Sequence, residues 1–218
     1  MRRGRIWAMV PLVVLLLARP VGAQEETTAR AREDSSRVVS PAECQVTPRA
    51  VTEIAQILQL NADGVRPPPY STISVPLGKV ADPATKLSIN EATREVLACF
   101  NAGDIPRAAA LMTEHGVQRA YWRLTIDPAA REATTARLAA PPQPRPEAAQ
   151  LRLIAVTDSS FLPDGSVVAF VVLSNPLLPP PGPETLLFSF AKQDDRWLVD
   201  DWVAFSLTPA SSEATPAP

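Results

Sequence analysis

The sequence is poor in the residues that build metal centres and most nucleophilic sites. Its 218 residues include one histidine and two cysteines. A structural zinc site needs four ligands, usually cysteine and histidine, so this chain could complete one only with several carboxylates. The motifs of serine hydrolases, phosphate-binding loops and dinucleotide-binding folds are also missing. We therefore expect no metal and no cofactor, and no motif identifies a reaction.

Long apolar runs are scarce as well. The run over residues 6–18 follows three arginines, and Arg19 and Pro20 end it after about 13 residues, short of the roughly 20 that span a bilayer. Small residues ending at Ala23 then fit a cleavage site. The pattern predicts a secretory signal peptide over residues 1–23 and a secreted or otherwise extracytoplasmic protein. The alternative is an uncleaved membrane anchor.

Clusters of basic residues are absent from the mature chain too. The first 23 residues carry four of the 21 Lys and Arg and none of the 23 Asp and Glu, so the mature chain has a net charge near −6. Binding to nucleic acid or to an anionic membrane surface depends on grouped basic side chains. The composition therefore argues against both kinds of partner.

Both ends of the mature chain lack hydrophobic periodicity. Residues 24–43 are polar and contain no aromatic side chain, and residues 209–218 consist largely of Ala, Ser and Pro. Neither segment can bury enough apolar surface to offset the entropy of ordering it. We expect a disordered tether and a disordered tail.

An extension over residues 44–81 separates the tether from the main domain. Thr47 is a suitable N-cap and Pro48 suits the first helical position, which predicts an amphipathic helix over residues 48–60. The proline-rich run at residues 66–69 predicts an extended segment that crosses the surface of the domain.

The main domain, residues 82–208, has helices first and strands afterwards. Asp82-Pro83 begins a long helix and Gly103 ends it. Shorter helices follow, and then alternating apolar segments at residues 151–157, 167–173, 185–191 and 197–205. This order predicts an α+β fold in which N-terminal helices pack on one face of a curved antiparallel sheet.

The strand at residues 167–173 is apolar on both faces. A half-exposed antiparallel strand would alternate apolar with polar residues. We therefore expect its second face to be covered by the helix at 48–60, by the proline-rich segment or by a second copy of the chain. If the helix at 48–60 covers it, we expect a monomer; otherwise a homodimer that pairs two sheets face to face takes its place.

Cys44 and Cys99 are the two cysteines of a chain predicted to leave the reducing cytoplasm. An even number of cysteines in an oxidising compartment predicts a disulfide between them. The bridge would fasten the helix at 48–60 to the first domain helix. The alternative is a pair of buried free thiols.

Residues 91–206 resemble the nuclear transport factor 2-like superfamily, which includes SnoaL-like proteins. The resemblance rests on Phe100-Asn101-Ala102-Gly103-Asp104, on the helix at 108–112 and on Arg196-Trp197-Leu198-Val199-Asp200-Asp201. The extension around Cys44 resembles that of uncharacterised secreted bacterial proteins with such domains. The resemblance implies a cone-shaped fold in which the helices and the curved sheet enclose an apolar pocket.

Enzymes of this superfamily commonly place an Asp base and a His partner in the pocket. Here His115 is predicted on a solvated turn between helices. Asp200 and Asp201 are adjacent on a strand and should point to opposite faces, so they cannot form a carboxylate pair. The carboxylates are expected at the rim, paired with Arg152 or Arg196. We therefore predict no catalytic residue.

The pocket is expected to be lined by aromatic and sulfur-containing side chains. The candidates are Met112, Tyr121, Trp122, Phe170, Phe188 and Trp202. They favour an exported, non-catalytic binding or interaction module for a small apolar ligand. The alternatives are a small-molecule isomerase, dehydratase or hydrolase of the same fold, and a structural accessory domain that self-associates.

Overall fold

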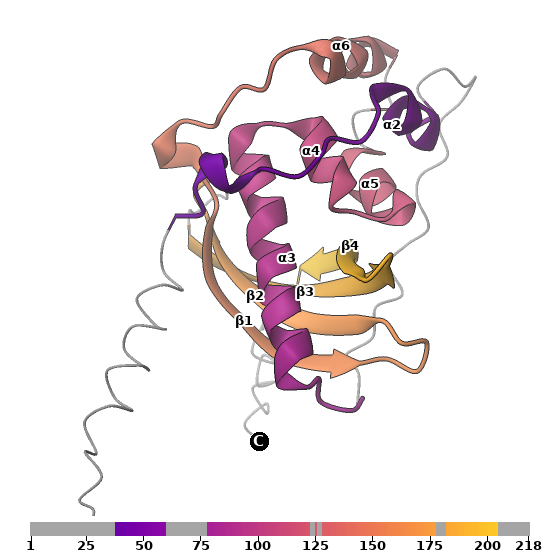
Figure 1. Cartoon of the computed structure of the whole chain (residues 1–218). Coiled ribbons are helices and arrows are strands. Elements are labelled where there is room, and N and C mark those ends of the chain that lie inside the picture. The colour runs from indigo at the N-terminus through magenta and orange to yellow at the C-terminus, as the bar shows by residue number, and fades with distance from the viewer. Residues whose placement is uncertain (1–37, 60–77, 123–124, 126–127, 178–181, 205–218) are drawn as a thin grey trace, which may run out of the picture. The chain divides into compact units, whose positions relative to one another are not determined.

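Helices precede a four-stranded antiparallel sheet in the computed structural model, which describes residues 38–59, 78–122, 125, 128–177 and 182–204 (Figure 1). The helical elements are η1 (Pro41–Glu43), α2 (Val51–Ile57), α3 (Pro83–Ala102), α4 (Ile105–Ala110), α5 (Glu114–Tyr121), α6 (Pro128–Ala139) and η3 (Glu147–Ala149). The strands are β1 (Arg152–Phe161), β2 (Val167–Asn175), β3 (Gly182–Gln193) and β4 (Arg196–Ala204). The predicted α+β class is confirmed. The predicted signal peptide, most of the tether, the proline-rich run and the tail lie outside the described residues.

Helix α3 begins and ends at the predicted residues. The Asp82 carboxylate accepts a hydrogen bond from the Thr85 backbone N–H at 2.9 Å, and Pro83 occupies the first turn. Gly103 closes the helix in the left-handed conformation, with φ of 65°. The helix crosses one face of the sheet in Figure 1, with contacts to β1 and β4.

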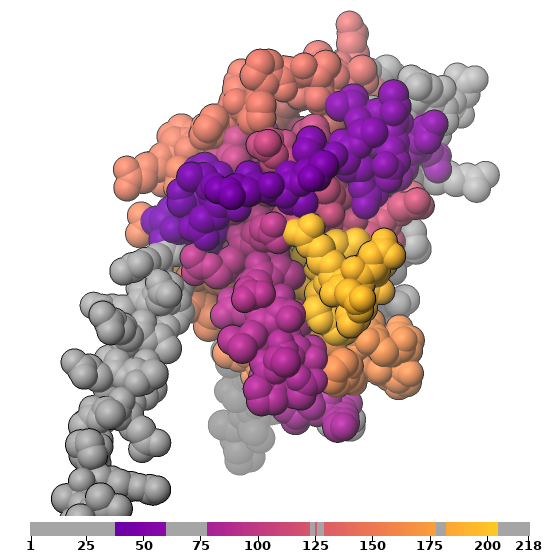
Figure 2. Space-filling model, in the orientation of Figure 1, coloured from indigo at the N-terminus to yellow at the C-terminus, as the bar shows by residue number. Residues whose placement is uncertain are grey.

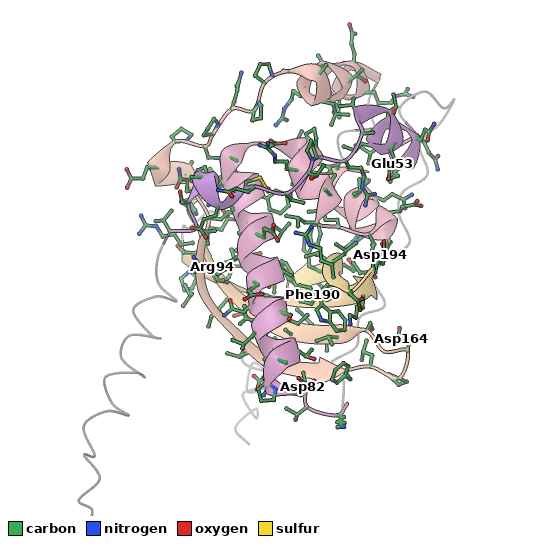
Figure 3. The ribbon with its side chains drawn as sticks, in the orientation of Figure 1. Glu53, Asp82, Arg94, Asp164, Phe190 and Asp194 are labelled. Carbon is green, nitrogen blue, oxygen red and sulfur yellow. A yellow bond between two sulfur atoms is a disulfide. The ribbon has the colours of Figure 1, made fainter. Side chains whose placement is uncertain are left out.

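The four strands form a meander in the order β1-β2-β3-β4. The β1–β2 turn uses Gly165, whose φ is 86°, and the β3–β4 turn uses Asp194 and Asp195 at positive φ, as two-residue hairpin loops require. Figure 3 shows Asp164 and Asp194 at these turns, at the same end of the sheet. Short backbone bridges join both sheet edges to other parts of the chain: Val38 and Val80 pair with β1, and Met112 pairs with β4.

The core lies between the helices and one face of the sheet. The odd-numbered residues of β2 from Val167 to Leu173 face the helices and join the core, together with the fully buried Phe190 of β3 (Figure 3). Val168, Phe170 and Val172 alternate with them on the other face. Helix α2 packs on α4, α5 and α6, so of the three expected covers for the second face this one is wrong.

The N-terminal extension is ordered earlier than its composition predicts. Val39 is fully buried and Val38 pairs with Arg152, although both were assigned to the tether. Figure 2 shows residues 38–59 as an indigo band over α3 and α4. The boundary at residue 43 was wrong because the buried Val39 side chain and the backbone bonds of Val38 and Val39 hold a segment that is otherwise polar.

Helix α2 begins three residues later than its capping signal predicts. Its N-cap is Ala50, and Pro48 lies before the helix. The segment stays extended because the Arg49 backbone N–H donates to the Pro106 carbonyl at 3.0 Å, and its guanidinium donates to the Met112 carbonyl at 2.8 Å. Tertiary hydrogen bonds therefore override the local signal.

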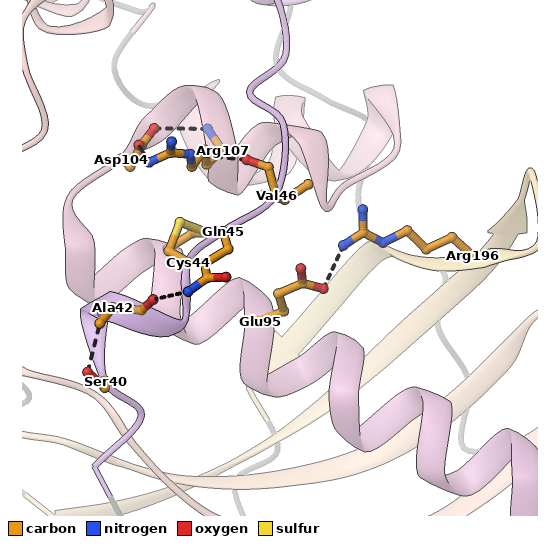
Figure 4. Close-up of a disulfide and its surroundings, with 10 residues drawn as sticks. Ser40, Ala42, Cys44, Gln45, Val46, Glu95, Asp104, Arg107 and Arg196 are labelled. Carbon is orange, nitrogen blue, oxygen red and sulfur yellow. Dashed lines mark hydrogen bonds and ion pairs between the residues drawn. A yellow bond between two sulfur atoms is a disulfide. The ribbon is translucent and has the colours of Figure 1, made fainter.

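The predicted disulfide between Cys44 and Cys99 is confirmed (Figure 4). Cys99 is fully buried on α3, and Cys44 follows η1 directly, so the bridge fastens η1, rather than α2, to α3. A neighbouring contact holds the same segment, residues 38–46, which we call the N-terminal strip: the Arg107 side chain donates to the Val46 carbonyl at 3.0 Å. The disulfide thus fixes the N-terminal strip beside the C-terminal half of α3.

Removing the disulfide is expected to destabilise the fold strongly. The cysteines are 55 residues apart, and chain-entropy reasoning puts the loss for such a loop at about 4 kcal/mol. Urea unfolding of the oxidised wild type and of a Cys44→Ala/Cys99→Ala variant measures the difference, with reduced wild type as the matched control. A loss below about 1 kcal/mol would contradict the expectation.

Two glycines allow the stability cost of a strained backbone to be separated from the cost of steric crowding. Gly103 and Gly165 both have positive φ, but a Cβ on Gly103 would lie 2.1 Å from the Gln143 carbonyl oxygen, whereas one on Gly165 would meet nothing within 4 Å. Gly165→Ala should cost about 1 kcal/mol, the penalty of a left-handed alanine. Gly103→Ala should cost clearly more, because the backbone at Gln143 must move. Equal losses in urea unfolding would contradict this reading.

Candidate functional site

A cavity of about 470 Å³ lies between α3 and the helix-covered face of the sheet. Eleven apolar residues line it: Leu97, Phe100, Met112, Leu151, Leu173, Leu186, Phe188, Val199, Trp202, Val203 and Ala204. Asn175, Glu184 and Arg119 add polar groups. The cavity lies where β1 and β3 begin and β2 and β4 end, because the meander brings these strand ends to one side.

The predicted cavity residues are divided by the fold. Met112, Phe188 and Trp202 line the cavity, and the rings of Phe188 and Trp202 lie 5.9 Å apart on neighbouring strands. Tyr121, at the end of α5, lines a separate cleft. Trp122, the C-cap of α5, is not among the residues that line the cavity. Phe170 lies on the opposite face of the sheet, because it occupies an even position of β2.

Arg119 and Glu184 are the two charged residues of the cavity lining, and sequence reasoning missed both. Arg119 lies on α5, and its Nε donates to the Asp201 carboxylate at 2.7 Å while Nη2 donates to the Trp202 carbonyl at 3.3 Å. The Asp201 side chain is 4% exposed, so this ion pair is largely buried. The expected partners of the carboxylates, Arg152 and Arg196, were wrong: Arg196 pairs with Glu95 instead.

Asp200 and Asp201 both reach the helical layer, because β4 contains a bulge. Ser189 pairs with Asp201 and Phe190 pairs with Val199, which leaves Asp200 as the extra residue. The Asp200 carboxylate accepts a hydrogen bond from the Thr113 hydroxyl at 2.6 Å. The expectation of strictly opposite directions fails at this bulge.

His115 lies in the first turn of α5 rather than on a solvated turn. Its Nδ1 is 3.5 Å from a carboxylate oxygen of Asp200, and its Nε2 is buried without a hydrogen-bond partner in the described part of the chain. A histidine oriented by a carboxylate is one half of a general-base arrangement. Neither His115 nor Asp200 is among the residues lining the cavity, however.

Within residues 38–59, 78–122, 125, 128–177 and 182–204, no group of three or more His, Cys, Asp or Glu residues is arranged to hold a metal ion. None of the helices in these ranges is both long and apolar enough to cross a membrane. Comparison of the chain with protein-family models, with curated proteins and with solved structures gives no match. The resemblance to the nuclear transport factor 2-like superfamily therefore stays a prediction.

Arg119 is expected to be essential for stability because it neutralises a buried carboxylate. Arg119→Gln leaves the buried Asp201 carboxylate without its charged partner, which should lower the free energy of unfolding by about 3 kcal/mol. The control is Arg196→Gln, whose ion pair with Glu95 is 41% and 32% exposed and should contribute less than about 1 kcal/mol. Urea unfolding of both variants checks the contrast, and similar losses would refute it.

Proposed function

We propose that this protein is an exported binding module whose cavity holds a small, largely apolar molecule. The observation that carries the proposal is the cavity itself, with eleven apolar residues out of fourteen and a volume of about 470 Å³. Small-molecule sites commonly enclose roughly 300–1,000 Å³ and combine an apolar lining with a few orienting polar groups. Each 100 Å² of apolar surface buried there would contribute about 2.5 kcal/mol.

The polar groups favour a ligand with one hydrogen-bonding end. Arg119 uses Nε and Nη2 in its bonds to Asp201 and Trp202, whereas a guanidinium has five N–H donors. The remaining donors can bind an acceptor on the ligand without disturbing the ion pair. Asn175 and Glu184 offer further polar contacts in the same cavity.

Export is part of the proposal. It is supported by the arginine-rich and apolar N-terminal pattern and by the Cys44–Cys99 disulfide, a bond typical of oxidising compartments. The nuclear transport factor 2-like fold is proposed on the same footing, from the motif at Phe100–Asp104 and from the order of helices and strands.

The enzyme alternative has one observation in its favour, the His115–Asp200 pair. A catalytic pair must lie within hydrogen-bond reach of the substrate. Because neither residue lines the cavity, the binding module explains the cavity better. His115→Ala should leave ligand binding in the cavity unchanged. A turnover assay in which this variant abolished activity would favour the isomerase, dehydratase or hydrolase.

The cavity is expected to bind the neutral apolar dye N-phenyl-1-naphthylamine with one site per chain. Fluorescence titration measures the affinity. Ala204→Trp adds an indole at an exposed position of the lining and should weaken binding about tenfold or more by filling the cavity. Ala133→Trp, at an exposed position on α6, is the matched control and should bind as the wild type does.

A second pair of variants tests which face of the sheet binds the dye. Phe188→Ala removes a phenyl ring from the cavity. Phe170→Ala removes a phenyl ring from the neighbouring strand, on the opposite face of the sheet. Phe188→Ala should change dye affinity and Phe170→Ala should not, with both compared at a temperature where each is folded. Absence of dye binding to the wild type, or equal effects of the two variants, would overturn the binding proposal.

A further inference from the structure

A second cleft, of about 410 Å³, opens beside the C-terminal end of α3. Its walls come from the end of α5, the start of α4, and α6 with the chain that follows it. Phe100 lines both this cleft and the apolar cavity. The two sites are therefore neighbours that share one aromatic side chain.

Two arginines line this cleft. Arg145 is fixed by its backbone N–H, which donates to the Asn101 carbonyl at 2.8 Å, and by its Nε, which donates to the Phe100 carbonyl at 3.2 Å. Those bonds leave both Nη groups of Arg145 for another acceptor. Arg137 is exposed on α6, and its side chain makes no hydrogen bond or ion pair with another residue in the described ranges.

The cleft also contains one carboxylate, that of Asp104, which is already neutralised. Its two oxygens accept hydrogen bonds from the Arg107 backbone N–H at 3.0 Å and from the Arg107 guanidinium at 3.1 Å. These bonds cap α4 and pair the negative charge. The positive charges of Arg137 and Arg145 therefore remain uncompensated.

The hydroxyl of Tyr121 adds a neutral donor close to these charges. Burial raises the pKa of Tyr121 well above its ordinary value; the nearby charges of Arg137 and Arg145 oppose that shift, and Asp104 adds to it. The hydroxyl therefore stays protonated at neutral pH. Among the described residues it has no hydrogen-bond partner, although Tyr121 is 8% exposed. An anion could satisfy this donor.

We propose that this cleft binds a small organic anion, a carboxylate or a phosphate monoester. The anionic group lies between the guanidinium groups of Arg137 and Arg145 and accepts a hydrogen bond from the Tyr121 hydroxyl. The carbon skeleton of the ligand packs against Phe100 and Ala120. The site is separate from the apolar cavity and does not depend on the function proposed for it.

Isothermal titration of the mature protein with benzoate and, separately, with phenyl phosphate tests the site in a phosphate-free buffer of low ionic strength. Arg137→Gln should weaken binding about tenfold, because it removes one charged donor without breaking any bond within the chain. Tyr121→Phe should weaken it about fivefold through loss of the hydroxyl alone. The matched control is Arg152→Gln, an exposed arginine outside the cleft, which should leave binding unchanged.

The two probes show which anion class the site prefers, and binding of either one supports the proposal. Failure of both to bind the wild type at millimolar concentration overturns it, as does an affinity that Arg137→Gln and Arg152→Gln change equally. Titration of Arg137→Gln with N-phenyl-1-naphthylamine should match the wild type. That measurement distinguishes a failure of the anion-binding proposal from a failure of the proposal that the apolar cavity binds a ligand.

Discussion

The side-chain amide of Asn101 holds three segments of the chain in one arrangement. Its Nδ2 donates to the Val39 and Leu151 carbonyls, both at 2.9 Å, and its Oδ1 accepts from the Leu151 N–H at 2.8 Å. The residue is fully buried, so each of these bonds replaces contact with water that the amide cannot regain. The N-terminal strip, the end of α3 and the start of β1 therefore have fixed relative positions. Both sites depend on this, because Phe100 and Leu151 line the cavity and Phe100 lines the cleft.

The elements that follow from local chemistry were predictable from the sequence. Asp82 with Pro83 and Gly103 mark the ends of α3, and the Asp-Gly pair at the β1–β2 turn marks the first hairpin. These signals act within a few residues, through caps and positive-φ glycines. The late start of α2 and the bulge at Asp200 were not predictable in this way. They depend on hydrogen bonds and strand register set by distant residues.

The lining of the candidate site was predictable only in part, for a similar reason. Both faces of β2 are apolar, so sequence could not show which face the helices cover, and Phe170 was assigned to the wrong one. Arg119 carries no sequence signal, because nothing distinguishes it from another charged residue on a short helix, and it acquires its role only when α5 lies against β4.

Both edges of the sheet are interrupted by backbone from elsewhere in the chain. Val38 and Val80 pair with β1, and the Val199 N–H and carbonyl on β4 bond to Leu111 and Thr113. Exposed strand edges are templates for pairing with other copies. Strand addition is therefore hindered at both edge strands, β1 and β4, while the backbone of the apolar strand β2 is already paired on both sides within the sheet.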